Sequence, residues 1–139
     1  MPAPERVLVV DVANVMGSVP DGWWKNRVAA AGRLHAAVVD ALDRGLLPYD
    51  RAILVMEGQS RAGAAEGVMG TTYVVHAPGS GDDEIVLHCR ALAEAEPAAE
   101  ITVATADRGL IARVAAMGAD IVGPRSIPRD TRRQATPRR

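Results

Sequence analysis

Short runs of apolar residues alternate along the chain with segments in which apolar residues recur every three or four positions. The runs are typical of strands covered on both faces inside a parallel sheet, and the spaced pattern is typical of helices with one buried face. The predicted strands cover residues 7–10, 51–57, 71–77, 100–105 and 119–123. The alternation predicts an α/β fold around a mostly parallel sheet of about five strands.

Capping signals set the ends of the helices between these strands. Asp21 is the expected N-cap of the first helix, and Gly45 is its C-terminal stop. Ser80, followed three residues later by Asp83, has the spacing of a capping box at the start of the second. The third covers about residues 108–117 and ends before a glycine.

Two adjacent tryptophans, Trp23 and Trp24, lie near the start of the first predicted helix. Trp24 continues the apolar stripe that includes Val28 and His35. Adjacent residues diverge by about 100° on a helix, so one tryptophan at most can serve the core and a site alike. We interpret the pair as core residues, with stacking on nucleic-acid bases as the alternative.

Glycine-, alanine- and serine-containing segments at 15–22 and 58–67 predict loops. The second has no apolar period, so we expect a mobile loop that can line a site. Arg61 lies in this loop and is a candidate for contact with a phosphate.

Composition indicates a single domain with an aliphatic core. The 139 residues are 48% hydrophobic and include no Phe, and the single cysteine, Cys89, cannot form an internal disulfide. No apolar run reaches the length of a membrane span, and no apolar segment of signal-peptide length precedes the first acids. We therefore expect a cytoplasmic protein with no membrane partner.

The charge is distributed unevenly between a body at 1–124 and a tail at 125–139. The tail has six arginines and one aspartate, a net charge of +5, whereas the body carries −6. Arg-rich tails that also contain Pro and Thr are typically disordered, and a basic tail favours a nucleic-acid partner.

Acidic residues follow several of the predicted strands. Asp11, Glu57 and Asp107 stand at strand ends, and Asp82 and Asp83 begin a helix. Right-handed crossovers bring the carboxyl ends of parallel strands to one edge, where α/β proteins bind ligands. Each acid has an ordinary alternative as a turn former or helix cap. Clustered carboxylates without a basic partner are most simply explained by a divalent cation, and oxygen ligands select Mg²⁺ or Mn²⁺. Such ions commonly serve phosphoryl chemistry, so a phosphodiester is the expected substrate.

Other acidic or phosphate-binding α/β sites do not match the residues. A phosphoaspartyl phosphatase needs a second Asp two positions after Asp11, where Ala13 stands. A receiver domain needs a Lys after its fifth strand, and Lys25 is the only lysine in the sequence. The chain also lacks the Gly-Lys-Ser/Thr of a P-loop and the GxGxxG of dinucleotide-binding folds.

The order of motifs resembles that of the NYN-domain group of PIN-like nucleases, especially its YacP-like branch. The resemblance covers residues 7–124 and rests on strand-DVANVMG, strand-MEG, a loop before GDDEI, and VATADRGL before the last helix. It implies a Rossmann-like three-layer fold and a small metal-dependent endoribonuclease. The implied metal ligands are Asp11, Asp83 and Asp107, with Asn14 positioning the site and Mg²⁺ or Mn²⁺ as cofactor. Glu57 and Asp82 are further candidate ligands.

One departure from the family pattern keeps a second function open. Many relatives have another acid two residues after Asp107, where this chain has Gly109. The alternative is a non-catalytic module that binds RNA or the ribosome. In either case the partner is RNA, and the oligomeric state stays open, a homodimer included. The candidates for substrate contact are Arg27, Arg61, Thr105 and Arg108.

Overall fold

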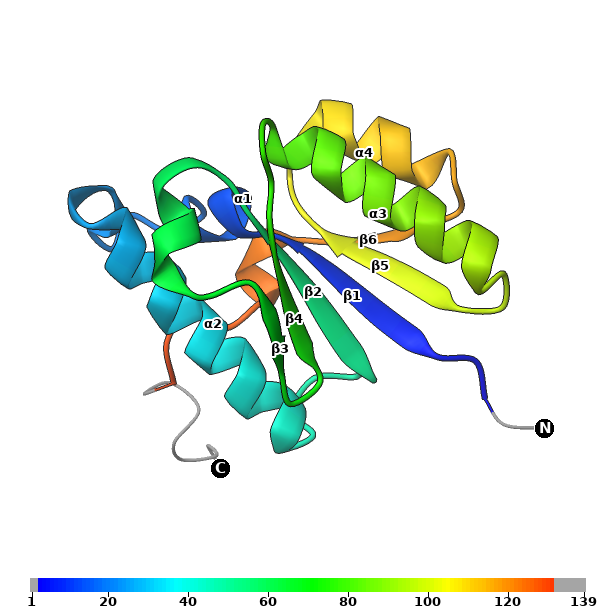
Figure 1. Cartoon of the computed structure of the whole chain (residues 1–139), viewed down its shortest axis with the longest axis horizontal. Helices are drawn as coiled ribbons and strands as arrows, with labels where there is room; N and C mark the ends of the chain where they lie inside the picture. The colour runs from blue at the N-terminus through cyan, green and yellow to red at the C-terminus, as the bar shows by residue number, and fades with distance from the viewer. Residues whose placement is uncertain (1–2, 132–139) are drawn as a thin grey trace.

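The computed structural model describes residues 3–131, and in that range six strands form a single sheet (Figure 1). They are β1 (Arg6–Asp11), β2 (Arg51–Met56), β3 (Gly67–Met69), β4 (Thr72–His76), β5 (Glu100–Ala104) and β6 (Asp120–Val122). Their order is β3-β4-β2-β1-β5-β6, and every neighbouring pair is parallel except β3 with β4. The expected mostly parallel sheet is confirmed, and β3 adds an antiparallel edge strand.

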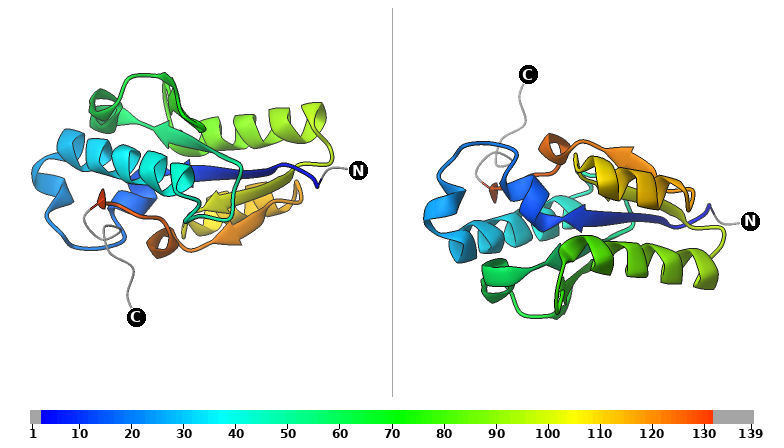
Figure 2. Two further views of the ribbon diagram at one scale, coloured as in Figure 1. Left: turned by 90° about the horizontal axis from the view of Figure 1, so that it is seen from below. Right: turned by 90° about the horizontal axis from the view of Figure 1, so that it is seen from above.

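Helices cover both faces of this sheet. The α-helices of the described residues are α1 (Val12–Met16), α2 (Arg27–Asp43), α3 (Gly81–Ala95) and α4 (Arg108–Ala115). Helices α1 and α2 pack on one face, and α3 and α4 pack on the other (Figure 2). The connections contain the 3₁₀ turns η1 (Trp23–Lys25), η2 (Gly58–Gly63) and η3 (Pro124–Ser126). This is the three-layer, Rossmann-like arrangement that the resemblance implies. Between residues 3 and 131, no helix has both the length and the hydropathy of a membrane span.

The central strand β1 shows why its sequence is an unbroken apolar run. Leu8 and Val10 pack against α1 and α2, whereas Val7 and Val9 pack against α3 and α4. All four side chains are fully buried. Because β1, β2, β4 and β5 are parallel, their carboxyl ends meet at one edge of the sheet, which we call the carboxyl edge.

The start of the first predicted helix is wrong by several residues. Asn26, not Asp21, caps α2, and its Oδ1 accepts a hydrogen bond from Ala29 N at 3.0 Å. Asp21 instead accepts from Trp23 N in the preceding turn. The buried stripe of α2 therefore begins after the tryptophans, and Trp24, expected in the core, is 49% exposed.

Two segments predicted as loops contain helical turns. Helix α1 covers part of 15–22, and η2 covers most of the glycine-rich stretch after β2. η2 packs closely on α2, because a Cβ at Gly63 would lie 2.7 Å from both Ala31 Cβ and Val28 O. The two backbones approach more closely there than any side chain larger than hydrogen permits.

The folded part of the chain extends beyond residue 124, where the sequence placed the start of a tail. Ile127 is 2% exposed and packs in the core beneath α1 and α2. Arg125 Nε donates to Ser18 O at 3.2 Å, and Arg129 forms a 2.8 Å ion pair with Asp21. Residues of the segment predicted as a tail therefore contact the domain as far as Arg129, and the part from 132 to 139 lies outside the described residues.

Candidate functional site

Asp11 lies at the carboxyl edge, where β1 runs directly into α1. Its side chain is 5% exposed and caps α1, with Oδ1 accepting from Asn14 N at 3.4 Å. Oδ2 accepts a second hydrogen bond, from Thr105 Oγ1, at 3.0 Å. Both carboxylate oxygens are thus held in place from two neighbouring segments.

The surroundings of Asp11 oppose its ionisation. Burial raises the pKa of its carboxyl to about 6, and the negative charges of Asp82 and Glu57 act in the same direction. The hydrogen bonds from Thr105 and Asn14 oppose this rise. The charged side chains among the main contributors to this pKa are both acids. At neutral pH, Asp11 is therefore a buried anion whose charged neighbours are acids.

The turn after β5 is tied to the turn after β1 by paired hydrogen bonds. Thr105 Oγ1, while donating to Asp11, accepts from Asp107 N at 3.1 Å. Asn14 Oδ1 accepts from Ala106 N at 2.8 Å. Asp107 then caps α4, with Oδ1 accepting from Leu110 N at 2.9 Å. The two sequence motifs DVAN and TAD, 94 residues apart at Asp11 and Thr105, therefore form one hydrogen-bonded unit.

Glu57 follows β2 and reaches the first residue of α3. Its Oε1 accepts from Gly81 N at 2.8 Å. Gly81 is buried, and a Cβ on it would overlap the Glu57 carboxylate, so glycine is required for this contact. The bond places an acid at the positive end of the α3 dipole.

Asp82 and Asp83, two of the three acids in the first turn of α3, have different surroundings. Burial raises the pKa of Asp82, the charges of Asp107 and Glu57 add to the rise, and the charge of Arg113 opposes it. The side chain of Asp83 is 72% exposed and forms a 3.0 Å ion pair with Arg113 of α4. The sequence favoured Asp83 as the acid of the cluster, whereas the structure brings Asp82 into electrostatic contact with the other acids.

The acids gather at one edge but do not close around a common point. Among residues 3–131, no three His, Cys, Asp or Glu side chains converge closely enough to hold one metal ion. One oxygen each of Glu57 and Asp107 is engaged by a backbone N–H. The acids of this cluster offer carboxylate oxygens as metal ligands, the ligand type that suits Mg²⁺ and Mn²⁺.

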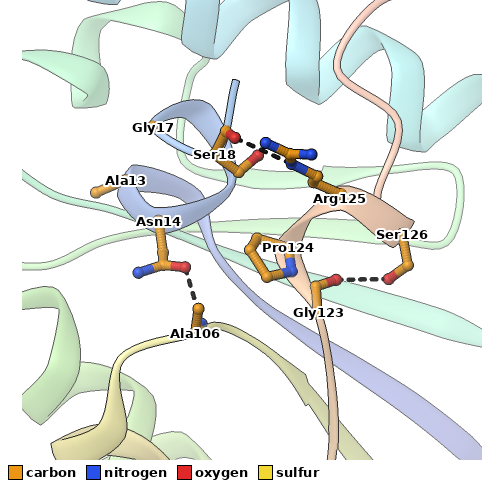
Figure 3. A pocket seen from close by; sticks show the side chains of 9 residues that line it. All are labelled: Ala13, Asn14, Gly17, Ser18, Ala106, Gly123, Pro124, Arg125 and Ser126. Atoms are coloured by element: carbon orange, nitrogen blue, oxygen red, sulfur yellow. Dashed lines mark hydrogen bonds between the residues drawn. The ribbon is translucent and has the colours of Figure 1, made fainter. Parts of the chain in front are cut away.

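Two hollows open at the carboxyl edge, one on each side of α1. The first, of about 580 Å³, lies between α1, the turn after β5 and η3. Figure 3 shows Asn14 turned toward Ala106 there, and Arg125 reaching Ser18. The second, of about 360 Å³, lies between α1, η1 and η2, and Glu57 lines it. Ala13 lines both, so the two hollows are adjacent.

The candidate substrate-contacting arginines are distributed around this edge. Arg108 is exposed in the first turn of α4, next to Asp107. Arg61 is fixed on η2, where Nε donates to Gly58 O and Nη1 donates to Ala77 O. The guanidinium of Arg27 lies 5.2 Å from the ring centroid of Trp23. Thr105, also predicted to contact substrate, is 1% exposed and instead orients Asp11.

Sequence reasoning missed site residues on η3 and on α4. Arg125 and Ser126 line the larger hollow although the sequence placed them in a tail. The signal that could have found them is Ile127, an isolated aliphatic residue in a basic stretch. Arg113, which pairs with Asp83, belongs to none of the sequence motifs. The ion pair forms because α4, which contains Arg113, packs beside α3.

No family model and no curated protein sequence matches this chain. Among solved structures, it is similar to the crystal structure of Rae1 (YacP) from Bacillus subtilis, solved as its W164L mutant. The TM-score is 0.60 at 19% sequence identity, over 88% of this chain and 72% of that one. A likeness at this level of identity shows a common fold. The chain therefore shares the fold of this YacP protein, as the sequence resemblance led us to expect.

Proposed function

We propose that this protein is a divalent-metal-dependent endoribonuclease whose centre is formed by Asp11, Asp82 and Asp107. The observation that carries the proposal is the state of Asp11, a buried carboxylate with acids as its charged neighbours. Holding such a group ionised is unfavourable unless a cation compensates it. The PIN-like fold supports the reading of this edge as a nuclease centre, and the resemblance of the motifs to NYN domains gives RNA as the substrate.

We assign the helix-start ligand to Asp82 rather than Asp83. Asp82 feels the charges of Asp107 and Glu57 more strongly than that of Arg113, whereas Asp83 forms a direct ion pair with Arg113 and lies mostly in solvent. An acid that already has a cationic partner gains less from a metal ion than one surrounded by acids. Glu57 lies beside the cluster and adds negative charge to it.

The residues around the acids have distinct positioning roles. Thr105 orients Oδ2 of Asp11 and the backbone of Asp107 at once. Asn14 fixes the turn after β5 by accepting from Ala106 N. A bound Mg²⁺ or Mn²⁺ supplies the positive charge that polarises a phosphodiester and favours ionisation of the attacking water. Arg108, exposed beside Asp107, is placed to contact a neighbouring phosphate of the RNA.

The adjoining hollows give an RNA strand room at this edge. Each is open to solvent close to the acids, one bounded by Asn14 and Arg125 and the other by Glu57 and Arg27. Arginines on both sides of an acidic centre are suited to hold the backbone phosphates that flank a cleaved bond.

The test is cleavage of a labelled RNA by purified protein with Mg²⁺, with Mn²⁺ and with chelator. We expect products only when a divalent cation is present, and none from Asp11→Asn under the same conditions. Circular dichroism and thermal melting show whether the variant is folded. Cleavage by folded Asp11→Asn at the wild-type rate contradicts the assignment of the centre.

A second function, non-catalytic RNA binding, is favoured by Gly109. This residue is exposed in the first turn of α4, so the helix contributes no acid at the position where many NYN domains have one. Salt-dependent RNA binding by a protein that does not cleave RNA with either metal identifies this function. Cleavage that depends on Asp11 excludes it.

A further inference from the structure

Three side chains at the carboxyl edge form a mixed aromatic and cationic surface, which we call the tryptophan patch: Trp23, Trp24 and Arg27. The two indole rings meet edge to face, with centroids 5.8 Å apart and planes at 89°. Arg27 places its guanidinium over the Trp23 ring, 5.2 Å from the centroid. Trp23 also packs against the core, whereas Trp24 is half exposed.

The tryptophan patch borders the 360 Å³ hollow. Trp23 and Arg27 line one side of it, and Glu57 and η2 line the other. The volume lies within the range of about 300–1,000 Å³ that is usual for pockets that take small organic ligands. Because Glu57 interacts electrostatically with Asp11 and Asp82, the same hollow adjoins the acidic cluster.

The local fold holds both walls of this hollow in place. Asn26 caps α2 directly after the tryptophans and so fixes the position of Arg27 at the first turn. The opposite wall, η2, rests on α2 through the close contact at Gly63, and Figure 2 shows the two segments side by side. Arg61 lies on η2 and Lys25 lies on η1, so both of these bordering elements carry a cationic residue.

We propose that the tryptophan patch is a binding site for unpaired nucleobases of an RNA strand. The inference rests on the proposed function, which places an RNA strand at this edge. Exposed aromatic rings stack on bases of any sequence, and an arginine beside them contacts the backbone or stacks as well. In an A-form duplex the faces of the bases are already stacked on one another, so the patch has nothing to bind.

The experiment measures fluorescence anisotropy of a labelled RNA of about 12 nucleotides, free or annealed to its complement, in metal-free buffer so that it stays intact. Wild type is expected to bind the single strand more tightly than the duplex. Trp24→Leu and Arg27→Gln are expected to weaken binding of the single strand by about 5- to 100-fold and to change duplex binding little. The matched control is Tyr73→Leu, an exposed aromatic beside a hollow at the opposite edge of the sheet, which is expected to bind as wild type does.

Equal affinity for the two RNA forms, or single-strand binding by both variants within about twofold of wild type, overturns the proposal. The same holds if the single strand does not bind at all, in which case the patch serves another partner, such as a peptide. Cleavage with Mn²⁺ is scored separately. If wild type binds the single strand through the patch but does not cleave RNA, the nuclease assignment is contradicted and the role of the patch is supported. If wild type and Trp24→Leu cleave both RNA forms equally well, the nuclease assignment is supported and the role of the patch is contradicted.

Discussion

Asp11 combines burial with negative charge, and this conflict is the physical basis of the proposed centre. Its two hydrogen bonds stabilise the ionised form only in part, so the pKa remains raised, at about 6. A side chain retained for folding alone would be better as an uncharged hydrogen-bonding residue. The position of Asp11 was predictable because it directly follows an apolar strand.

The choice between Asp82 and Asp83 was not predictable from the sequence. The two are adjacent and both suit a helix start, and about 100° on the helix separates their directions. What distinguishes them is Arg113, which is 30 positions from Asp83 and meets it only because α3 and α4 pack side by side. Sequence spacing carries no signal for that contact.

The pH dependence of stability in the metal-free protein follows from the raised pKa of Asp11. Since the folded pKa, about 6, exceeds the ordinary value of 3.8, the folded state binds this proton more tightly than the unfolded state. The free energy of unfolding therefore includes a favourable contribution from this group near pH 4, where the Asp11 carboxyl is protonated in the folded protein. This contribution falls as the pH rises through 6, by up to about 3 kcal/mol. Chemical denaturation of wild type and Asp11→Asn at pH 4 and pH 7 measures it.

The comparison uses the difference between the two proteins, so titrating groups that do not interact with Asp11 cancel. Wild type is expected to lose stability relative to Asp11→Asn between pH 4 and pH 7. A difference that stays constant across this range means that Asp11 is not a destabilising anion in the folded protein.

At the level of elements, the strands were predictable and the segment boundaries near the site were not. β1 and β2 are buried on both faces, which leaves an unambiguous apolar run. The first turn of α2 was misplaced because Trp24 and Val28 imitate a helical stripe, although both are exposed and the cap is Asn26. Short elements such as α1 and β3 lack the length that a periodic pattern needs.

Packing of η2 on α2 gives a prediction at this scale. Gly63→Ala inserts a methyl group against Ala31 and the backbone of Val28 and is expected to lower the unfolding free energy by about 1–3 kcal/mol. Gly79→Ala is the matched control, because a Cβ there meets nothing within 4 Å. Urea denaturation of both variants provides the measurement. Equal stability of the two variants shows that η2 is not held by this close contact.

At the scale of the whole molecule, parallel topology makes the candidate site. Asp11, Glu57 and Asp107 come from strands that are far apart in sequence, and the order of β2, β1 and β5 in the sheet brings their ends together. This convergence could be predicted because crossover handedness fixes the edge at which parallel strands end. The hollow bounded by Arg125 could not, since it needs the chain to return across α1 after β6.

At this edge Asp83 forms an ion pair with Arg113, and this contact gives Asp83 different surroundings from those of Asp82. The centre that we propose therefore depends on Asp82 and not on its neighbour. Replacing Asp83 by Asn removes an exposed ion pair, which contributes about 0–1 kcal/mol and no ligand.

The most direct test of this account is the rate of RNA cleavage in saturating Mn²⁺ by Asp82→Asn and Asp83→Asn, compared with wild type. We expect Asp82→Asn to lose at least about 100-fold in rate, because removal of a residue that only supports a metal ligand already costs about 10- to 100-fold. We expect Asp83→Asn to keep the rate within about threefold of wild type. The reverse order, with Asp83 required and Asp82 dispensable, would contradict the arrangement of the acidic centre described above, as would the absence of cleavage by wild type.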